Sequence, residues 1–144
     1  MSKKLKECYE SDFDDTELSK EIFGTWTTYE EDINAGQWLA PVKVAAYVQH
    51  NFNPDVSIGD IACGTGLVAK LLKPGFYTNI EGYDITVEFL EKAKEHYKST
   101  TYNDITAKAL PKQYEVVTAS GVFAPGHLSA SPSKNIADSL LPGG

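Results

Sequence analysis

The fold of this 144-residue chain is decided by Ile58-Gly59-Asp60-Ile61-Ala62-Cys63-Gly64-Thr65-Gly66. An apolar run leads into two closely spaced glycines, and a helical pattern over residues 67–73 follows at once. Glycine has no side chain and tolerates positive φ, so a strand that turns there into a helix presents bare backbone N–H groups to a ligand. The stretch therefore predicts a strand, a ligand-binding turn and a helix.

Two further acids follow strand-like segments. Asp84 ends the run 79–84, and an acid about 20 residues beyond a glycine turn accepts hydrogen bonds from ribose hydroxyls in nucleotide-binding βαβ units. Asp104 follows an extended stretch over 98–102 and is placed to accept the exocyclic amine of adenine. Ligands of open α/β sheets bind outside the carboxyl ends of the strands, so Asp60, Asp84 and Asp104 are expected to converge on one crevice.

The position of Asp60 separates two cofactor classes. An acid just before the glycines fits poorly beside a pyrophosphate but suits the ammonium and sulfonium charges of S-adenosylmethionine. The spacing Gly64-x-Gly66-x-x-Ala69 also matches the dinucleotide fingerprint, so an NAD-dependent oxidoreductase is kept as an alternative. All thirteen basic residues are lysines, and no arginine is present to clamp phosphates. The charge pattern favours the methyl donor.

The motifs also carry a family resemblance. Asp60-Ile-Ala-Cys-Gly-Thr-Gly66 resembles motif I of class I S-adenosylmethionine-dependent methyltransferases, and Gly82-Tyr-Asp84-Ile-Thr resembles their ribose strand. The resemblance implies an α/β, Rossmann-like methyltransferase fold, in which a parallel sheet carries helices on both faces. It places Gly64 and Gly66 near the methionine part, Asp84 at ribose and Asp104 at adenine. The implied cofactor-binding residues are Tyr29, Asp60, Ala62, Cys63, Gly64, Gly66, Asp84, Ile85, Asp104, Ile105 and Ala119.

A narrower resemblance covers residues from about Ile22 to the last. The segments Phe23-Gly-Thr-Trp26-Thr-Thr-Tyr29, Ala40-Pro41 and 63–69 resemble the Williams-Beuren-region methyltransferase-like proteins, which implies that Tyr29 closes over the cofactor. Ala62 stands where motif I usually has its first glycine, and Leu39 where this family is expected to have a basic residue. The resembled fold continues after the Leu-Pro-Gly-Gly turn into three more strands. We therefore expect an N-terminal portion whose fourth strand is an open edge, prone to self-association.

Composition predicts one soluble domain, with 42% apolar and 23% charged residues. Residues 1–20 read as an acidic lead and 21–144 as the cofactor-binding domain. The start lacks the apolar core of a signal peptide, and no stretch is long enough for a membrane helix, so we expect a cytoplasmic protein. The body lacks the basic footprint of a nucleic-acid binder. Cys8 and Cys63 have neither disulfide nor metal-site spacing, and Cys63 reads as a small buried turn residue.

The remaining pattern predicts alternating helices and strands. Helices are expected over 36–51 and 67–73, and a third runs through His96 with Thr86 as its N-cap. A last helix is capped by Ser131 and buries Ile136, Leu140 and Leu141, and a fourth strand is expected over 114–120. The spacing of Phe23, Trp26 and Tyr29 is also that of one helical face.

The sequence predicts the function in less detail than the fold. Methyl transfer requires no particular catalytic residue, because the cofactor carries the reactive group. His127 is a candidate base, and a structural loop histidine is its alternative. The leading hypothesis is methyl transfer to an unidentified small molecule or protein side chain. A catalytically silent module that binds S-adenosylmethionine or S-adenosylhomocysteine is the other hypothesis from this cofactor class.

Overall fold

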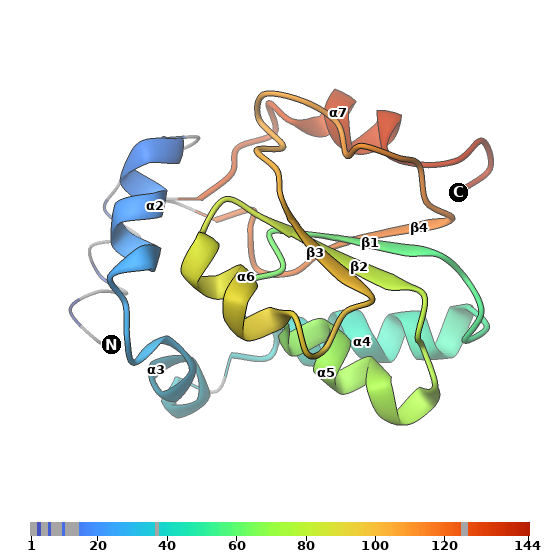
Figure 1. The fold of residues 1–144 in the computed structure, drawn as a ribbon, viewed down its shortest axis with the longest axis horizontal. Helices are drawn as coiled ribbons and strands as arrows, with labels where there is room; N and C mark the ends of the chain where they lie inside the picture. The colour runs from blue at the N-terminus through green and yellow to red at the C-terminus, as the bar shows by residue number, and fades with distance from the viewer. Residues whose placement is uncertain (1–2, 4–5, 7–9, 11–14, 37, 125–126) are drawn as a thin grey trace.

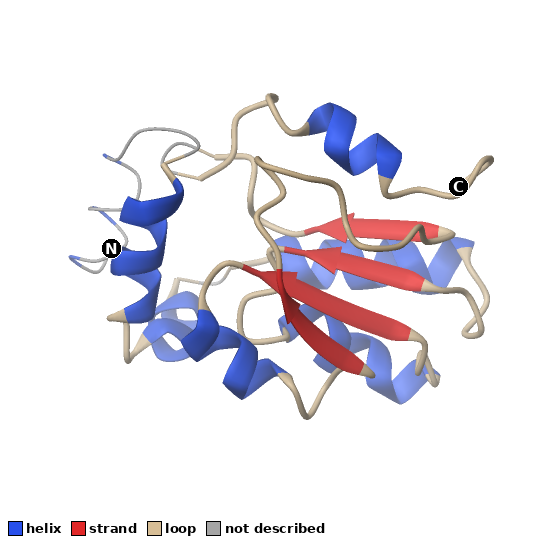
Figure 2. Cartoon of the chain, turned by 45° about the horizontal axis from the view of Figure 1, so that its top comes forward, coloured by secondary structure: helices blue, strands red, loops and turns tan. Residues whose placement is uncertain are grey.

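The computed structural model describes residues 3, 6, 10, 15–36, 38–124 and 127–144. Its centre is a four-stranded, fully parallel sheet in the order β3-β2-β1-β4 (Figures 1 and 2). The strands are β1 (Ile58–Ile61), β2 (Ile80–Asp84), β3 (Ser99–Tyr102) and β4 (Val116–Ala119). The register aligns Ile58 with both Ile80 and Val116. The predicted parallel α/β fold is confirmed, and within the described residues β4 is an outer strand.

Helices lie on both faces of this sheet, as predicted. They are α2 (Thr16–Gly24), α3 (Tyr29–Ala35), α4 (Ala40–Asn51), α5 (Leu67–Leu72), the 3-10 turn η1 (Lys73–Gly75), α6 (Val87–Ala93) and α7 (Ser133–Asp138). α4, α5 and α6 pack on one face and α7 lies over the other, while α2 and α3 sit beyond the carboxyl ends of the strands (Figures 1 and 2). The strand ends therefore open toward α2 and α3.

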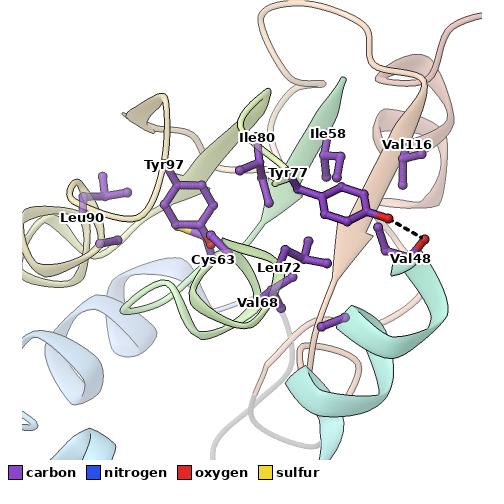
Figure 3. Close-up of a cluster of buried hydrophobic side chains, with 13 residues drawn as sticks. Val48, Ile58, Cys63, Val68, Leu72, Tyr77, Ile80, Leu90, Tyr97 and Val116 are labelled. Carbon is purple, nitrogen blue, oxygen red and sulfur yellow. Dashed lines mark hydrogen bonds between the residues drawn. The ribbon is translucent and has the colours of Figure 1, made fainter. Parts of the chain in front are cut away.

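The larger core fills the space between the sheet and α4, α5 and α6. Alternate strand residues point into it, among them Ile58, Ile80 and Val116, and they meet Val48 of α4 and Leu72 of α5 (Figure 3). Ile58 and Leu72 are fully buried, and burial of a side chain of this size contributes about 1.5–3 kcal/mol. The core fixes β1, and with it the turn that follows.

The opposite face buries a charged group as well as apolar ones. Glu81 accepts hydrogen bonds from the hydroxyls of Tyr114 (2.6 Å) and Tyr83 (3.2 Å) and pairs with Lys112 (2.6 Å). Burial acts to raise the pKa of Glu81, but Lys112 and the two tyrosines hold it below its usual value. Gly59 is required beneath this network, because a Cβ there would lie 2.6 Å from the Tyr114 ring.

Several helix boundaries differ from prediction. α4 begins at Ala40 rather than at residue 36, and α6 ends at Ala93 rather than at 96. The last helix begins at Ser133 with Pro132 as N-cap, so Ser131 is not the cap. It also ends early, because the chain turns to let Leu141 N–H bond to the carbonyl of Tyr114 (2.8 Å).

This turn changes the buried stripe that was predicted for the last helix. Ser139 is fully buried there. Its hydroxyl is satisfied, because it donates to Asn135 O (2.7 Å) and accepts from Leu110 N–H (2.9 Å). Leu141 is 39% exposed, so its predicted burial is wrong.

The N-terminal region also departs from expectation. α2 begins at Thr16, with the Asp15 carboxylate accepting from Leu18 N–H (2.9 Å), so the boundary predicted at residue 20 lies inside a helix. Phe23 lies in α2, Trp26 lies between the two helices and Tyr29 begins α3, so the three aromatics do not share one helical face. Cys8 lies outside the described residues.

The structure offers no candidate for a membrane-crossing helix over the described part of the chain.

Candidate functional site

A pocket lies at the carboxyl ends of the strands, beneath α2 and α3. Seven predicted site residues line it: Tyr29, Ala62, Gly64, Asp84, Ile85, Asp104 and Ile105. The other four do not line it: Asp60, Cys63, Gly66 and Ala119. The structure thus brings the acids of β2 and β3 to one pocket, while the acid of β1 lies elsewhere.

The turn over residues 62–66, called here the glycine turn, has three residues in the left-handed region. Ala62 has a φ of 50°, Gly64 of 56° and Gly66 of 95°. Gly66 N–H donates to Cys63 O (3.0 Å), and Gly66 O then accepts from Lys70 N–H (2.9 Å) as α5 begins. A residue with a Cβ pays about 1–2 kcal/mol for this conformation, so Ala62 is strained where glycine is usual in the resembled motif.

Asp84 ties the glycine turn to the end of β2. Its Oδ2 accepts from Gly64 N–H (2.8 Å) and its Oδ1 from Thr86 N–H (2.8 Å). The side chain is buried, which raises the pKa of Asp84 against the opposing effect of these backbone donors. The Thr86 hydroxyl and the Ile85 N–H also act to lower this pKa, so several donors of the strand end converge on the Asp84 carboxylate. Asp84 thereby fixes the glycine turn against the end of β2 at the wall of the pocket.

Asp60 lies on the face of β1 that α4, α5 and α6 cover, away from the pocket. It is 1% exposed and accepts from the hydroxyls of Thr118 (2.6 Å) and Tyr97 (2.6 Å). Burial raises the pKa of Asp60 to about 6, even though both hydroxyls act to lower it. In this structure Asp60 supports the glycine turn from below and does not contact the space that a ligand would fill.

Tyr97 completes this support. A Cβ at Gly66 would lie 3.2 Å from the Tyr97 ring and one at Gly82 would lie 3.1 Å from it, so the ring packs against both glycines. Cys63 lies beside the same ring (Figure 3). Burial raises the pKa of the Cys63 thiol well above its ordinary value, which keeps it protonated. Its predicted role as a small buried turn residue is confirmed.

Asp104 stands at the opposite side of the pocket. Its Oδ1 accepts from the backbone N–H (3.0 Å) and hydroxyl (2.6 Å) of Thr106, and its Oδ2 from the hydroxyl of Thr16 in α2 (2.9 Å). Partial burial acts to raise the pKa of Asp104, but these donors hold it below the usual value. Asp104 therefore remains charged and joins the strand end to α2.

Aromatic rings close the pocket from the side of residues 16–35, called here the cover. Tyr29 lies 4.7 Å from Phe89 and 5.2 Å from Trp26, and Phe23 lies 5.4 Å from His127, each measured between ring centroids. A Cβ on Gly64 would lie 3.9 Å from the Tyr29 hydroxyl, which places Tyr29 over the glycine turn. His127 lines the pocket, and its role as a base stays a prediction.

The sequence missed several lining residues. Asn103 and Ser120 each follow a strand, so the rule that ligands bind at strand ends would have found them. Thr16 and Ser19 fall in the segment assigned to the lead, which gave no signal for them. The ring of Trp38 packs so closely on Gly121 that a Cβ there would lie 2.7 Å away. Predicted Ala119 packs instead against the core beneath α7.

The charges of the pocket match a cationic ligand. Among the described residues that line it, the carboxylates are Asp84 and Asp104, and none is lysine. Apolar and aromatic residues make up most of the remaining wall. Such a wall with a few convergent polar groups is typical of a small-molecule or cofactor site.

Comparisons with known proteins show the family and the fold of this chain. A family model described as a methyltransferase domain matches residues 59–144, more than half of the chain. A search of curated protein sequences finds no significant match.

Three solved structures show the same fold. YjhP from E. coli is 20% identical with a TM-score of 0.56, over 71% of this chain and 46% of that protein. A Thiobacillus denitrificans S-adenosylmethionine-dependent methyltransferase in complex with S-adenosyl-L-homocysteine is 18% identical with a TM-score of 0.55, over 71% and 45%. A TehB-like methyltransferase from Corynebacterium glutamicum is 17% identical with a TM-score of 0.61, over 82% and 71%. The chain spans less than half the length of the first two.

Proposed function

Because this chain belongs to the family of methyltransferase domains, we propose that its pocket binds S-adenosylmethionine and that the domain transfers the methyl group of this ligand to an acceptor. The observation that carries the proposal is the contact of Asp84 with the glycine turn. Asp84 accepts from Gly64 N–H and lines the pocket at the end of β2, the position from which an acid accepts ribose hydroxyls in nucleotide-binding βαβ units. The acidic, lysine-free wall described above supports a ligand that carries ammonium and sulfonium charges.

The bound cofactor supplies an electrophilic methyl carbon: an acceptor lone pair forms the new bond to it, the carbon–sulfur bond electrons stay on sulfur, and the acceptor loses a proton. The described residues then bind and orient the reactants. Asp84 would hold the ribose and Asp104 and Ile105 the adenine end, while Tyr29, which the cover places over the glycine turn, would exclude water. Asp60 acts from beneath, through Tyr97 and Thr118.

The acceptor is proposed to be a small molecule or a protein side chain, with His127 as the candidate base near it. We also propose that the chain is related to the Williams-Beuren-region methyltransferase-like proteins. We further propose that it self-associates through the edge of β4. The bond from Leu141 N–H to Tyr114 O lies just before β4 and does not cover its edge. Sedimentation that shows a concentration-independent monomer would count against self-association.

The cofactor proposal is tested by calorimetric titration with S-adenosylmethionine, S-adenosylhomocysteine and NADH. We expect the first two to bind and Asp84→Asn to weaken both about 100-fold, since a charged hydrogen-bond acceptor contributes about 1.5–3 kcal/mol. Glu81→Gln is the matched control, because it removes a charge from the same strand outside the pocket. NADH binding in place of S-adenosylmethionine, or equal affinities for wild type and Asp84→Asn, would contradict the proposal.

The silent-module hypothesis differs from this proposal only in turnover. If S-adenosylmethionine binds and Asp84→Asn weakens it, the cofactor site is established whether or not methyl transfer follows. Release of S-adenosylhomocysteine in the presence of an acceptor would exclude a purely binding role.

A further inference from the structure

One end of the pocket lies beyond the residues assigned to the cofactor. The sheet order β3-β2-β1-β4 puts Asp104, Asp84 and the glycine turn after three neighbouring strands, so a ligand that contacts all three extends toward β4. On that side the pocket is lined by residues that follow β4 and by two aromatic residues that contact them. This part, called here the β4 end, consists of Phe23, Trp38, Gly121, Val122, His127 and Leu128.

Aromatic rings from separate segments meet at the β4 end. The Trp38 ring packs directly on the backbone after β4, since a Cβ at Gly121 would lie 2.7 Å from it. Phe23 reaches the same end from α2, and its ring lies 5.4 Å from that of His127 at an interplanar angle of 51°. Phe23 and Trp38 line the pocket and are only partly buried, so ring surface remains for a ligand. Aromatic pairs attract beyond the area they bury, which favours a ligand with a ring.

The charges of the pocket are unevenly placed. Its two carboxylates, Asp84 and Asp104, follow β2 and β3, whereas the six residues of the β4 end include no acid and no lysine. A lysine or arginine side chain that entered there would find no carboxylate, and an anionic acceptor would find no lysine. Burying a charge without a partner is costly, so the β4 end favours an acceptor without charge.

We propose that the β4 end binds an uncharged aromatic small molecule with a hydroxyl group and that this molecule is the methyl acceptor, an inference that rests on the proposed function. The ring of the acceptor lies against Phe23 and Trp38. Its hydroxyl oxygen forms the new bond to the methyl carbon, the electrons of the carbon–sulfur bond stay on sulfur, and the hydroxyl proton passes to a base, for which His127 is the candidate. This narrows the acceptor from a small molecule or a protein side chain to one class of small molecule.

The experiment titrates the protein loaded with S-adenosylhomocysteine with three probes: 2-naphthol, 2-naphthoate and Nα-acetyl-lysine amide. We expect 2-naphthol to bind about tenfold more tightly than either charged probe. Trp38→Leu should weaken 2-naphthol about tenfold by removing a ring contact, and it should leave the affinity for S-adenosylhomocysteine unchanged. Phe76→Leu is the matched control, because Phe76 is 79% exposed and lies outside the pocket, so binding of 2-naphthol should survive.

Phe23→Leu is the second variant if Trp38→Leu folds poorly, and it should weaken 2-naphthol in the same way. With S-adenosylmethionine that carries a labelled methyl group, the wild type should form labelled 2-methoxynaphthalene. Tighter binding of the lysine probe would assign a protein side chain instead, and equal binding of the three probes or no effect of either variant would also overturn the proposal.

Two outcomes separate this inference from the function on which it rests. Binding of S-adenosylhomocysteine without binding of 2-naphthol, or binding of 2-naphthol without labelled product, would overturn the assignment of the acceptor alone. A wild type that does not bind S-adenosylhomocysteine would overturn the proposed function itself.

Discussion

The glycine turn and the cover meet at one pocket but are held in different ways. Below the turn, Asp60 is buried with two hydroxyl donors, and at its side Gly64 N–H bonds to Asp84. The cover instead rests on ring contacts such as Phe23 with Phe89 (centroids 5.8 Å apart) and on the bond from Thr16 to Asp104. The turn is fixed by buried polar bonds, and the cover by contacts at its surface.

This difference indicates which part of the site responds to a ligand. Preorganised groups bind without rearrangement, and the glycine turn is already held by bonds from Gly64 N–H to Asp84 and from Cys63 N–H to Tyr83 O. Opening the cover breaks few buried bonds, so local opening should cost less there than in the turn. We therefore expect ligand entry to displace residues 16–35 and to leave the glycine turn unchanged.

The largest expected effect comes from a substitution in the turn itself. Gly66→Ala should destabilise the protein by about 3 kcal/mol, because a Cβ at a φ of 95° is strained and would lie 3.1 Å from His96 and 3.2 Å from Tyr97. S-adenosylmethionine affinity should fall with it. Urea unfolding and calorimetric titration measure the two effects.

Ala62→Gly is the matched control in the same turn, and its expected effect on stability has the opposite sign. Ala62 already has a φ of 50°, so glycine relieves strain and should stabilise the protein by about 0.5 kcal/mol after its larger unfolded-state entropy is subtracted. A loss of stability in Ala62→Gly would show that strain does not govern the turn.

The glycine turn and the cover also differ in what the sequence reveals. The strand, the glycines and Asp84 lie within one local pattern, so the strand, the turn and its acid were predictable. The bond between Thr16 and Asp104 joins residues far apart in the chain, and no local pattern announces it. Asp60 was placed correctly on β1, but its bond to Tyr97 joins it to a partner outside the motif, which the local pattern does not reveal.

A smaller effect is expected from the buried acid below the turn. The pKa of Asp60 is about 6 in the folded protein and about 3.9 when unfolded, so the folded state binds more protons between these values. Its stabilising contribution is complete below pH 4 and is lost as pH rises toward 6. Between pH 4 and 7 the wild type should therefore lose about 2 kcal/mol relative to Asp60→Asn. Parallel stability curves for the two proteins in urea unfolding would contradict a raised pKa.

The smallest effect is expected at the edge of the cover. Thr16→Val keeps the shape of the side chain but removes the hydroxyl that donates to Asp104, a bond worth about 1 kcal/mol. Hydrogen exchange of α2 amides should accelerate about fivefold, while amides of the glycine turn keep their rates. Thr106→Val is the matched control, because it removes another hydroxyl donor to Asp104 from outside α2. If Thr106→Val accelerates the hydrogen exchange of the α2 amides equally, the charge of Asp104 and its loop holds the cover, and the bond to Thr16 does not.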